Sequence, residues 1–424
     1  MNRSKTFPFG GIRVDSFRSL TENRGVQSLS LPSLAVVPLV QYHGARATWV
    51  VAVGESIREE QLLAKGLGPG DLDVHSPTPG ILQEFREVPV PGGGVSSAAL
   101  IRLDGSFNRT GRDVPVRDWS GWSPAELLEH IRSCGVYLES STLDKAVRLP
   151  EASVGLDDLV INGLQPEPYL TLALALLDER SAALAEGIEI LRKIYSPLHT
   201  LLVTDRDDTS PWQAVSAISL PGVELVSLEY KFPQAQAGLL AKTLSTGPRC
   251  LIIDVNGVLS VRDAVVEGRP QIERTVVLSG QGARHPGTYR VRIGTPLFQF
   301  LKDAGGIKPN SEKIVVGGPF QGRLADNLAS PIVKSTQAVL VLAKSEVNTG
   351  VSRACIRCGS CVKSCPVGLE PLNLYKLLRQ DNVVQARNDG LDFCIGCGIC
   401  SFVCPSRLPL VETFQRVQEE TSRG

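Results

Sequence analysis

The 424-residue chain lacks a net charge, because 44 lysines and arginines balance 44 aspartates and glutamates. This balance excludes a global field that would attract nucleic acid or an anionic membrane, so electrostatic attraction must come from local patches. A long apolar run is also missing: the longest, at residues 169–177, is far short of the ~20 residues that span a bilayer. Residues 1–10 lack the apolar core and cleavage site of a signal peptide. The sequence therefore predicts a soluble protein on the cytosolic side, at most peripheral to a membrane.

The chain is too long for one compact core, and its length predicts two to four domains. Ten cysteines are present, and eight of them fall between Cys355 and Cys404. Such clustering without a secretion signal indicates metal ligands rather than disulfides. The other two, Cys134 and Cys250, stand alone and are predicted to be small buried apolar residues.

Short β segments broken by glycine and proline fill residues 1–115. The order of motifs at residues 53–57, 61–63 and 75–82 resembles the small barrel-sandwich of biotinyl and lipoyl domains. Carrier domains of that family present a lysine at a hairpin tip, and no lysine stands in that context here. The prediction is a structural β module with no attached cofactor.

From about residue 123 the pattern changes to alternating helices and strands. Ser123, Pro124 and Glu126 are typical of a helix N-terminus, because they supply a cap, a first-turn proline and an acid near the helix dipole. Helices are predicted at residues 123–131, 169–193, 234–244 and 260–267, and strands at residues 158–161, 200–204, 222–228 and 250–255. The alternation predicts an α/β domain with a largely parallel sheet over residues 116–280. Further strands and one short helix predict a small α+β unit over residues 281–345.

Two cysteine runs of identical spacing lie in the last domain, residues 346–424. They are Cys355, Cys358, Cys361 and Cys365, followed by Pro366, and Cys394, Cys397, Cys400 and Cys404, followed by Pro405. This spacing is that of bacterial ferredoxins with two [4Fe–4S] clusters, in which the fourth cysteine of each run ligates the other cluster. One cluster is thus predicted on Cys355, Cys358, Cys361 and Cys404, and the other on Cys394, Cys397, Cys400 and Cys365.

A pair of zinc sites is the alternative, but zinc sites usually present C-x2-C pairs separated by longer spacers. Two complete runs that each end in proline favour iron–sulfur clusters. Residues 371–390, between the runs, are predicted to be helical and to pack the module on its neighbour. The cations Arg353, Arg357 and Lys363 surround the first run. They would either dock an acidic redox partner or offset the charge of the cluster, and the sequence leaves both open.

The chain resembles the C subunit of the Rnf-type electron-transport complex, a membrane-bound, ion-translocating oxidoreductase that links ferredoxin or flavodoxin to NAD. The resemblance is carried by the paired cysteine runs and by residues 160–163, 167–170, 231–234, 265–270, 272–274, 289–296 and 316–319. It implies a central domain similar to the flavin- and NADH-binding subunit of respiratory complex I, followed by a β-grasp module. It also implies the other subunits of an Rnf-like complex as partners, and a peripheral place on the cytoplasmic side of the cell inner membrane.

Three segments depart from the flavin site of that family. The family's loop G-x-G-G-A-G-F-P-T corresponds to residues 133–142, which keep one glycine and include Glu139, a side chain that would repel a phosphate. Gln165 and Pro166 replace a carboxylate and a thiol, and residues 256–259 read Asn-Gly-Val-Leu in place of Asn-Val-Gly-Thr. We therefore expect FMN and NADH binding to be lost, so that electrons enter from a small acidic flavodoxin or ferredoxin.

Two classes of function remain open. The first is an electron-transfer subunit of an Rnf-like membrane complex that relays electrons through two [4Fe–4S] clusters, fed either by NADH through a retained FMN or by a small protein carrier. The second is a soluble iron–sulfur oxidoreductase with its own substrate site. The degraded flavin loop counts against the second class, because such a chain holds no two-electron centre. The sequence leaves open whether the chain oxidises NADH on its own.

Overall fold

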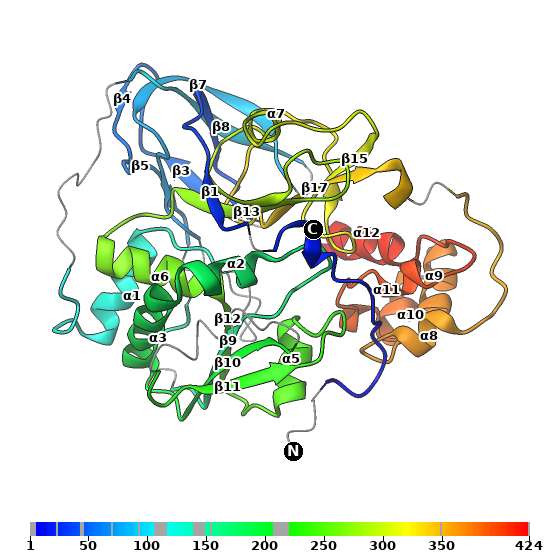
Figure 1. The fold of residues 1–424 in the computed structure, drawn as a ribbon. Coiled ribbons are helices and arrows are strands. Elements are labelled where there is room, and N and C mark those ends of the chain that lie inside the picture. The colour runs from blue at the N-terminus through cyan, green and yellow to red at the C-terminus, as the bar shows by residue number, and fades with distance from the viewer. Residues whose placement is uncertain are drawn as a thin grey trace.

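The computed structural model describes residues 6–22, 24–42, 46–68, 71–91, 94–105, 117–138, 149–152, 155–206, 220–347 and 350–422. Figure 1 shows two β-rich parts above a parallel sheet with its helices, and a helical module at the right. The mixed α/β content and the separate helical module are as predicted from the sequence.

The first β-rich part is a sandwich of two antiparallel sheets. One sheet has the order β2-β8-β7-β4 and the other β3-β5-β6. The strands are β2 (Leu34–Pro38), β3 (Ala47–Trp49), β4 (Ser56–Ile57), β5 (Leu62–Gly66), β6 (Val74–His75), β7 (Gly80–Pro89) and β8 (Val95–Arg102). Val37, Leu63, Leu82 and Ile101 are buried in the core between the two sheets. This agrees with the predicted barrel-sandwich.

The central sheet has the order β11-β10-β9-β12, and all its described pairings are parallel, as predicted. Its strands are β9 (Asp158–Asn162), β10 (His199–Asp205), β11 (Glu224–Leu228) and β12 (Cys250–Asp254). The helices beside it are α1 (Pro124–Ser133), α2 (Leu172–Glu179), α3 (Ser181–Tyr195), α5 (Ala237–Leu244) and α6 (Val255–Glu267). The predicted N-terminus of α1 is confirmed, because Ser123 and Glu126 form a reciprocal capping box.

Two helix predictions for the central domain are wrong. The single helix predicted over residues 169–193 is broken at Arg180, which leaves the helical conformation (φ −124°, ψ 29°). Its guanidinium donates two hydrogen bonds to the carboxylate of Asp263, at 2.6 and 3.0 Å. Helix α6 begins five residues before the predicted start, because the Asp254 carboxylate accepts the Gly257 N–H at 2.9 Å and caps it.

The second β-rich part is a six-stranded mixed sheet, β1-β14-β13-β17-β15-β16. Its elements are β1 (Val26–Ser28), β13 (Glu273–Ser279), β14 (Gly287–Arg292), β15 (Ser311–Val316), β16 (Arg323–Leu324), β17 (Ala338–Ala343) and helix α7 (Leu297–Asp303). Strand β1, from the N-terminal region, runs parallel to β14, and β13 precedes the domain boundary that the sequence places at residue 280. The sheet therefore draws strands from both sides of the predicted boundaries.

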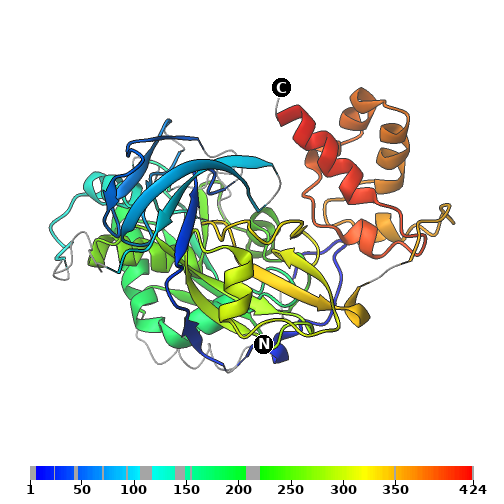
Figure 2. The ribbon, with the colours of Figure 1, turned by 90° about the horizontal axis from the view of Figure 1, so that it is seen from above.

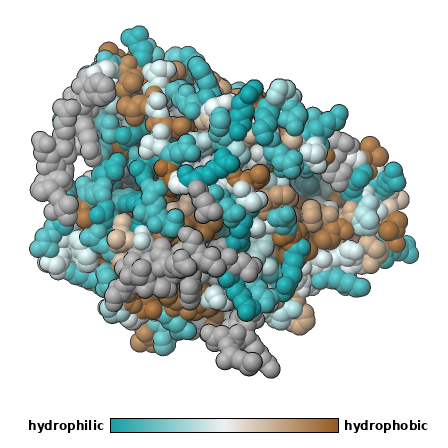
Figure 3. All heavy atoms as spheres, viewed as in Figure 1, coloured by the Kyte–Doolittle hydropathy of each residue, from teal (hydrophilic) through white to brown (hydrophobic). Residues whose placement is uncertain are grey.

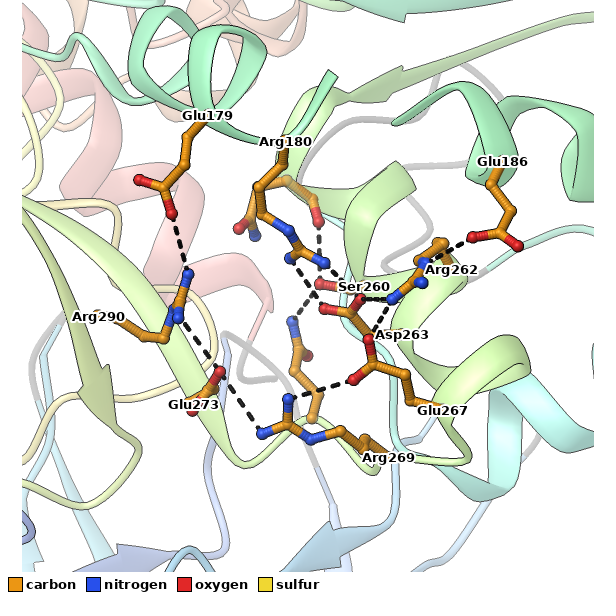
Figure 4. A network of polar contacts seen from close by, with 12 residues as sticks. Glu179, Arg180, Glu186, Ser260, Arg262, Asp263, Glu267, Arg269, Glu273 and Arg290 are labelled. Atoms are coloured by element: carbon orange, nitrogen blue, oxygen red, sulfur yellow. Dashed lines mark hydrogen bonds and ion pairs between the residues drawn. The ribbon is translucent and has the colours of Figure 1, made fainter. Parts of the chain in front are cut away.

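A network of ion pairs links this sheet to the helices of the central domain (Figure 4). Arg290 of β14 pairs with Glu179 of α2 at 3.3 Å, and also with Glu273 of β13. On α6, Arg262 pairs with Glu186 of α3 and with Glu267. Single exposed pairs contribute about 0–1 kcal/mol, whereas pairs that share partners and lie half buried hold their geometry better. The network fixes the six-stranded sheet against the helices beside the central sheet.

The helical module lies to one side of the central sheet and the six-stranded sheet, as Figure 2 shows. It contains α8 (Ser360–Ser364), α9 (Pro371–Arg379), α10 (Val383–Asn388), α11 (Ile399–Phe402) and α12 (Leu410–Ser422). The helix predicted over residues 371–390 is two helices, because Asp381 takes a left-handed conformation (φ 55°) between them. No helix in the described parts of the chain is both long and apolar enough to cross a membrane.

Candidate functional site

The two cysteine runs form matching local structures. Gly359 and Gly398 take φ values of 73° and 74° and precede the short helices α8 and α11. Glycine suits both positions because it enters the left-handed region without steric cost. In each run the third cysteine lies on the short helix and the fourth follows it. Helices α8 and α11 contact each other, which brings the two runs together.

The thiol of the fourth cysteine in each run influences the pKa of thiols in the other run. Burial raises the pKa of the Cys394 and Cys400 thiols, and raises the pKa of Cys397 to about 12. The neighbouring Cys365 thiol raises the pKa of all three further. Burial likewise raises the pKa of Cys361, and the Cys404 thiol adds to that effect. The ligand sets that the spacing predicts stay a prediction.

This donor set fits iron–sulfur clusters chemically. Buried thiols that repel one another ionise readily only when a cation lies among them, and metal binding supplies that charge. Backbone N–H groups also point at the sulfurs: Leu369 donates to Cys365 at 3.3 Å, and Leu408 donates to Cys404 at 3.5 Å. Such bonds help to set cluster potentials. Within the described residues, no three acidic, histidine or cysteine side chains converge enough to hold one single metal ion.

The two predicted cluster positions differ in their surroundings. Cys355 and Cys358 are exposed, whereas Cys397 is buried. Around the first run, the apolar side chains of Ile356 and Val362 are 68% and 42% exposed. The predicted cations Arg353, Arg357 and Lys363 are exposed in the same region. Figure 3 shows apolar side chains gathered at the right of the molecule, over this module. The first position therefore offers an accessible face of mixed apolar and basic character.

The second position faces the rest of the protein. Cys397 lies in an apolar cluster with Phe232, which follows strand β11, and with Ile399. Phe320, from the turn between β15 and β16, packs against this cluster and stacks on Phe232 with ring centroids 4.4 Å apart. The buried cysteine thus lies where the module meets the central domain and the six-stranded sheet.

The N-terminal segment, residues 6–22, joins the module to the central domain, a role that was not predicted from the sequence. The N–H of Gly11 donates to the Ser364 carbonyl at 2.9 Å, next to the ligand position Cys365. Ile12 and Phe232 exchange two backbone hydrogen bonds of 3.0 Å. The ammonium of Lys231 donates to the Phe7 carbonyl at 2.8 Å. The one signal in the sequence is the tandem glycine at residues 10–11.

We expect Gly10→Ala to loosen the attachment of the module. Gly10 has a φ of +61°, and an added Cβ would lie 2.4 Å from the Cys365 carbonyl oxygen. Gly25 has a φ of +62° with nothing within 4 Å, so Gly25→Ala is a matched control. In both variants an alanine must adopt the left-handed conformation, which destabilises the fold by about 1–2 kcal/mol. Only Gly10→Ala adds a clash with the Cys365 carbonyl oxygen. Limited proteolysis should release the module faster from Gly10→Ala, and equal rates for the two variants would contradict this role.

The carboxyl edge of the parallel sheet is where open α/β sheets bind ligands. Here the Gln165 side chain donates to the Ser16 carbonyl at 2.8 Å, and its N–H donates to Asp205 at 2.9 Å. Phe17 stacks on Tyr169 with ring centroids 4.3 Å apart. The N-terminal segment therefore covers residues that follow β9, and its Ser16 carbonyl takes the side-chain hydrogen bond that Gln165 could offer to a ligand.

The loop predicted to be degraded is only partly described, because Glu139 and residues 140–142 lie outside the described residues. Leu138 is 1% exposed, and its side chain packs at the start of α6. If Gly257 carried a Cβ, that atom would lie 3.1 Å from a methyl carbon of Leu138. An apolar side chain thus lies at a helix N-terminus that could otherwise receive a phosphate.

Near the same strand ends, four buried polar atoms lack a hydrogen-bond partner among the described residues: Thr204 Oγ1, Tyr230 Oη, Gln234 Oε1 and Asn256 Nδ2. These four atoms favour the alternative that this edge of the sheet still binds a polar ligand such as FMN.

The fold and the cysteine module define an electron-transfer protein of the two-cluster iron–sulfur class. The family described as RnfC barrel sandwich hybrid domain matches residues 5–106, and the 4Fe-4S dicluster domain matches residues 350–407. The C subunit of the ion-translocating oxidoreductase complex of Rhodobacter capsulatus is 31% identical over 98% of this chain and 84% of its own length. The chain therefore belongs to the family of the C subunits of Rnf-type ion-translocating oxidoreductase complexes.

Two further relatives agree with this assignment. The C subunit of the proton-translocating ferredoxin:NAD(+) oxidoreductase complex of Clostridium ljungdahlii is 29% identical over 90% of this chain and 86% of its own length. The C subunit of the ion-translocating oxidoreductase complex of Serratia proteamaculans is 32% identical over 97% of this chain, which spans 60% of that relative. A solved NAD+-reducing [NiFe]-hydrogenase aligns with a TM-score of 0.49 and 12% identity, covering 73% of this chain and 63% of that one. That alignment is too weak to carry an argument.

Proposed function

We propose that this chain is the electron-transfer subunit of a membrane-associated, redox-driven, ion-translocating complex, and that it relays electrons through two [4Fe–4S] clusters. The observation that carries the proposal is the contact between helices α8 and α11, which brings the two cysteine runs together. We propose that the fourth cysteines are cross-placed, Cys365 with the second run and Cys404 with the first. The proposed ligand sets are Cys355, Cys358, Cys361 and Cys404, and Cys394, Cys397, Cys400 and Cys365. When bound, each cluster supplies one-electron chemistry.

The residues of the chain have three tasks in this function. The thiolates hold the two clusters next to each other, and backbone N–H groups such as that of Leu369 donate hydrogen bonds to the sulfurs. Phe232 and Phe320 give the second position an apolar surrounding, because they pack with Cys397. The open, basic face near the first position is suited to exchange electrons with an acidic partner protein.

The finer domain assignment belongs to the same proposal. It comprises a barrel-sandwich over residues 1–115, an α/β domain resembling the complex I flavin subunit over 116–280, a β-grasp module over 281–345 and the ferredoxin-like domain over 346–424. The parallel sheet supports the second assignment, and the mixed sheet with its helix α7 supports the third. We propose that the β-grasp module also includes β1 and β13, because both strands pair within its sheet.

FMN and NADH are not proposed as ligands, because the residues present fit them poorly. Leu138 lies at the α6 N-terminus, and the hydrogen bonds of Gln165 are taken by Ser16 and Asp205. Electrons would then enter from a small carrier, a flavodoxin or ferredoxin, that docks near Arg353, Arg357 and Lys363. The contrary reading, an NADH-oxidising subunit that retains FMN, draws on the four unpartnered polar atoms near the strand ends.

Cell fractionation tests the place of the protein in a membrane complex. We expect the protein to sediment with the inner membrane, on whose cytoplasmic side we place it, and to be released by a chaotrope or high pH. It should also copurify with the other subunits of the complex. Deleting those subunits should move it to the soluble fraction. A wholly soluble protein in cells that contain the other subunits would overturn the proposal.

A further inference from the structure

A buried carboxyl group lies close to the second cluster position. Glu167 follows strand β9 and is 4% exposed. Its Oε2 accepts the backbone N–H groups of Phe320 at 2.8 Å and Gln321 at 3.3 Å. An added Cβ on Gly318 would lie 2.2 Å from the carboxyl carbon of Glu167. The turn between β15 and β16 therefore closes tightly around this carboxyl group.

The same turn touches the second cysteine run on its other side. Phe320 packs in the apolar cluster that contains Cys397. The carbonyl oxygen of Phe320 would lie 2.9 Å from an added Cβ on Gly398, the residue next to Cys397. One residue thus contacts both the Glu167 carboxyl group and the loop that carries Cys397. Charges on the two sides of such a water-poor junction interact strongly, because little solvent screens them.

No cation is among the groups that act on Glu167 within the described residues. The turn at residues 317–322 carries no ionisable side chain. From the neighbouring strand ends, Tyr230 interacts with Glu167 and with Asp205. The N-terminal segment contributes Asp15 and Arg18, which act on Tyr230. Burial raises the pKa of Glu167 to about 7, although the two N–H bonds act in the opposite direction.

We propose that Glu167 is a proton-binding site that takes up one proton for each electron received at the second cluster position, and returns it when the electron leaves. The inference rests on the proposed function, which supplies the electron through a one-electron carrier protein. The proton comes from solvent and converts the Glu167 carboxylate to the carboxylic acid. One negative charge and one positive charge arrive together, so the net charge of the buried junction does not change.

The sign of the pH dependence follows from the charges. A cluster held by four thiolates is negative, so its presence raises the pKa of Glu167 above the value set by burial, and an added electron raises it further. Protons therefore accompany reduction in the neutral to alkaline range. There the midpoint potential of the second cluster should fall as the pH rises, and at acidic pH it should be constant.

The test is a redox titration of the anaerobically purified full-length protein, followed by electron paramagnetic resonance at several pH values. We expect one cluster to show the alkaline fall in potential and the other to serve as an internal control. In Glu167→Gln the fall should vanish, and the potential should exceed that of the wild type at alkaline pH but equal it at acidic pH. The controls Asp205→Asn and Tyr230→Phe should keep the fall.

Infrared difference spectroscopy on the wild type gives a second readout that needs no variant. Reduction should produce the C=O band of a protonated carboxylic acid, and Glu167→Gln should lack that band. A potential that is independent of pH in the wild type, or a fall that persists in Glu167→Gln, would overturn the inference. Protein without either cluster signal would instead overturn the proposed function, so the two failures are distinguishable.

Discussion

Replacing Cys365 with alanine should remove the cluster built mainly by the second cysteine run, although Cys365 belongs to the first run in sequence. The iron and acid-labile sulfide of anaerobic protein should fall from about eight to about four of each per chain, following the two-cluster rule. The reason is the spacing of the runs, which predicts that Cys365 completes the ligand set of Cys394, Cys397 and Cys400, and three thiolates hold a cubane far less well than four.

The cluster signal that each cysteine variant loses distinguishes cross-placed ligand sets from ligand sets that follow the order of the sequence. Cys365→Ala and Cys397→Ala should remove the same resonance signal, and Cys404→Ala and Cys361→Ala should remove the other. Cys134→Ala and Cys250→Ala, at the two solitary buried cysteines, should leave both signals intact. If Cys365→Ala and Cys361→Ala removed the same signal, the clusters would follow the order of the sequence and the cross-placement would be wrong. Stoichiometric zinc without broad visible absorbance would exclude iron–sulfur clusters altogether.

The features that the sequence predicted well depend on contacts within a few residues. The cap of α1 needs only Ser123 and Glu126, and both hydrogen bonds are formed. The turns before α8 and α11 need Gly359 and Gly398 at the same place in each run. Local patterns of this kind are readable because the residues that interact stand together in the chain.

Several of the features that were missed depend on partners far away in the sequence. Arg180 ends α2 because its guanidinium reaches Asp263, 83 residues later. Strand β1 joins a sheet whose other strands begin at Glu273. Glu167 was predicted only as part of a family segment, and its carboxyl group becomes unusual because Phe320 and the turn around it bury it. Composition and periodicity carry no trace of such pairings, since the chain must fold before they exist.

The N-terminal segment shows the same limit at the candidate site. Its backbone hydrogen bonds to Ser364 and Phe232 involve no side chain, so residue type reveals little about them. The segment lies both against the cysteine module and over Gln165 at the sheet edge. The segment thus links two features that looked independent in the sequence, the attachment of the module and the cover over Gln165 at the sheet edge.

Protein purified under anaerobic conditions should contain much less than one FMN per chain, and NADH alone should not bleach its clusters. The apolar side chain of Leu138 lies at the α6 N-terminus, and Gln165 donates its hydrogen bonds to Ser16 and Asp205 rather than to a flavin. Each flavin hydrogen bond left unmade costs about 1–3 kcal/mol, and every 1.4 kcal/mol lowers affinity about tenfold. A few such losses reduce a tight flavin site to negligible occupancy.

A reduced acidic flavodoxin or ferredoxin should bleach the clusters instead, because it can dock on the exposed basic face of the first run. Arg353→Glu with Arg357→Glu should slow that reduction about tenfold or more at low salt, since both charges steer the encounter. Arg379→Glu, an exposed cation at the end of α9 rather than on a cysteine loop, is the matched control. Added salt should slow the wild type toward the rate of the double variant. Stoichiometric FMN after gel filtration, or bleaching by NADH alone, would show that the four unpartnered polar atoms near the strand ends mark a working flavin site.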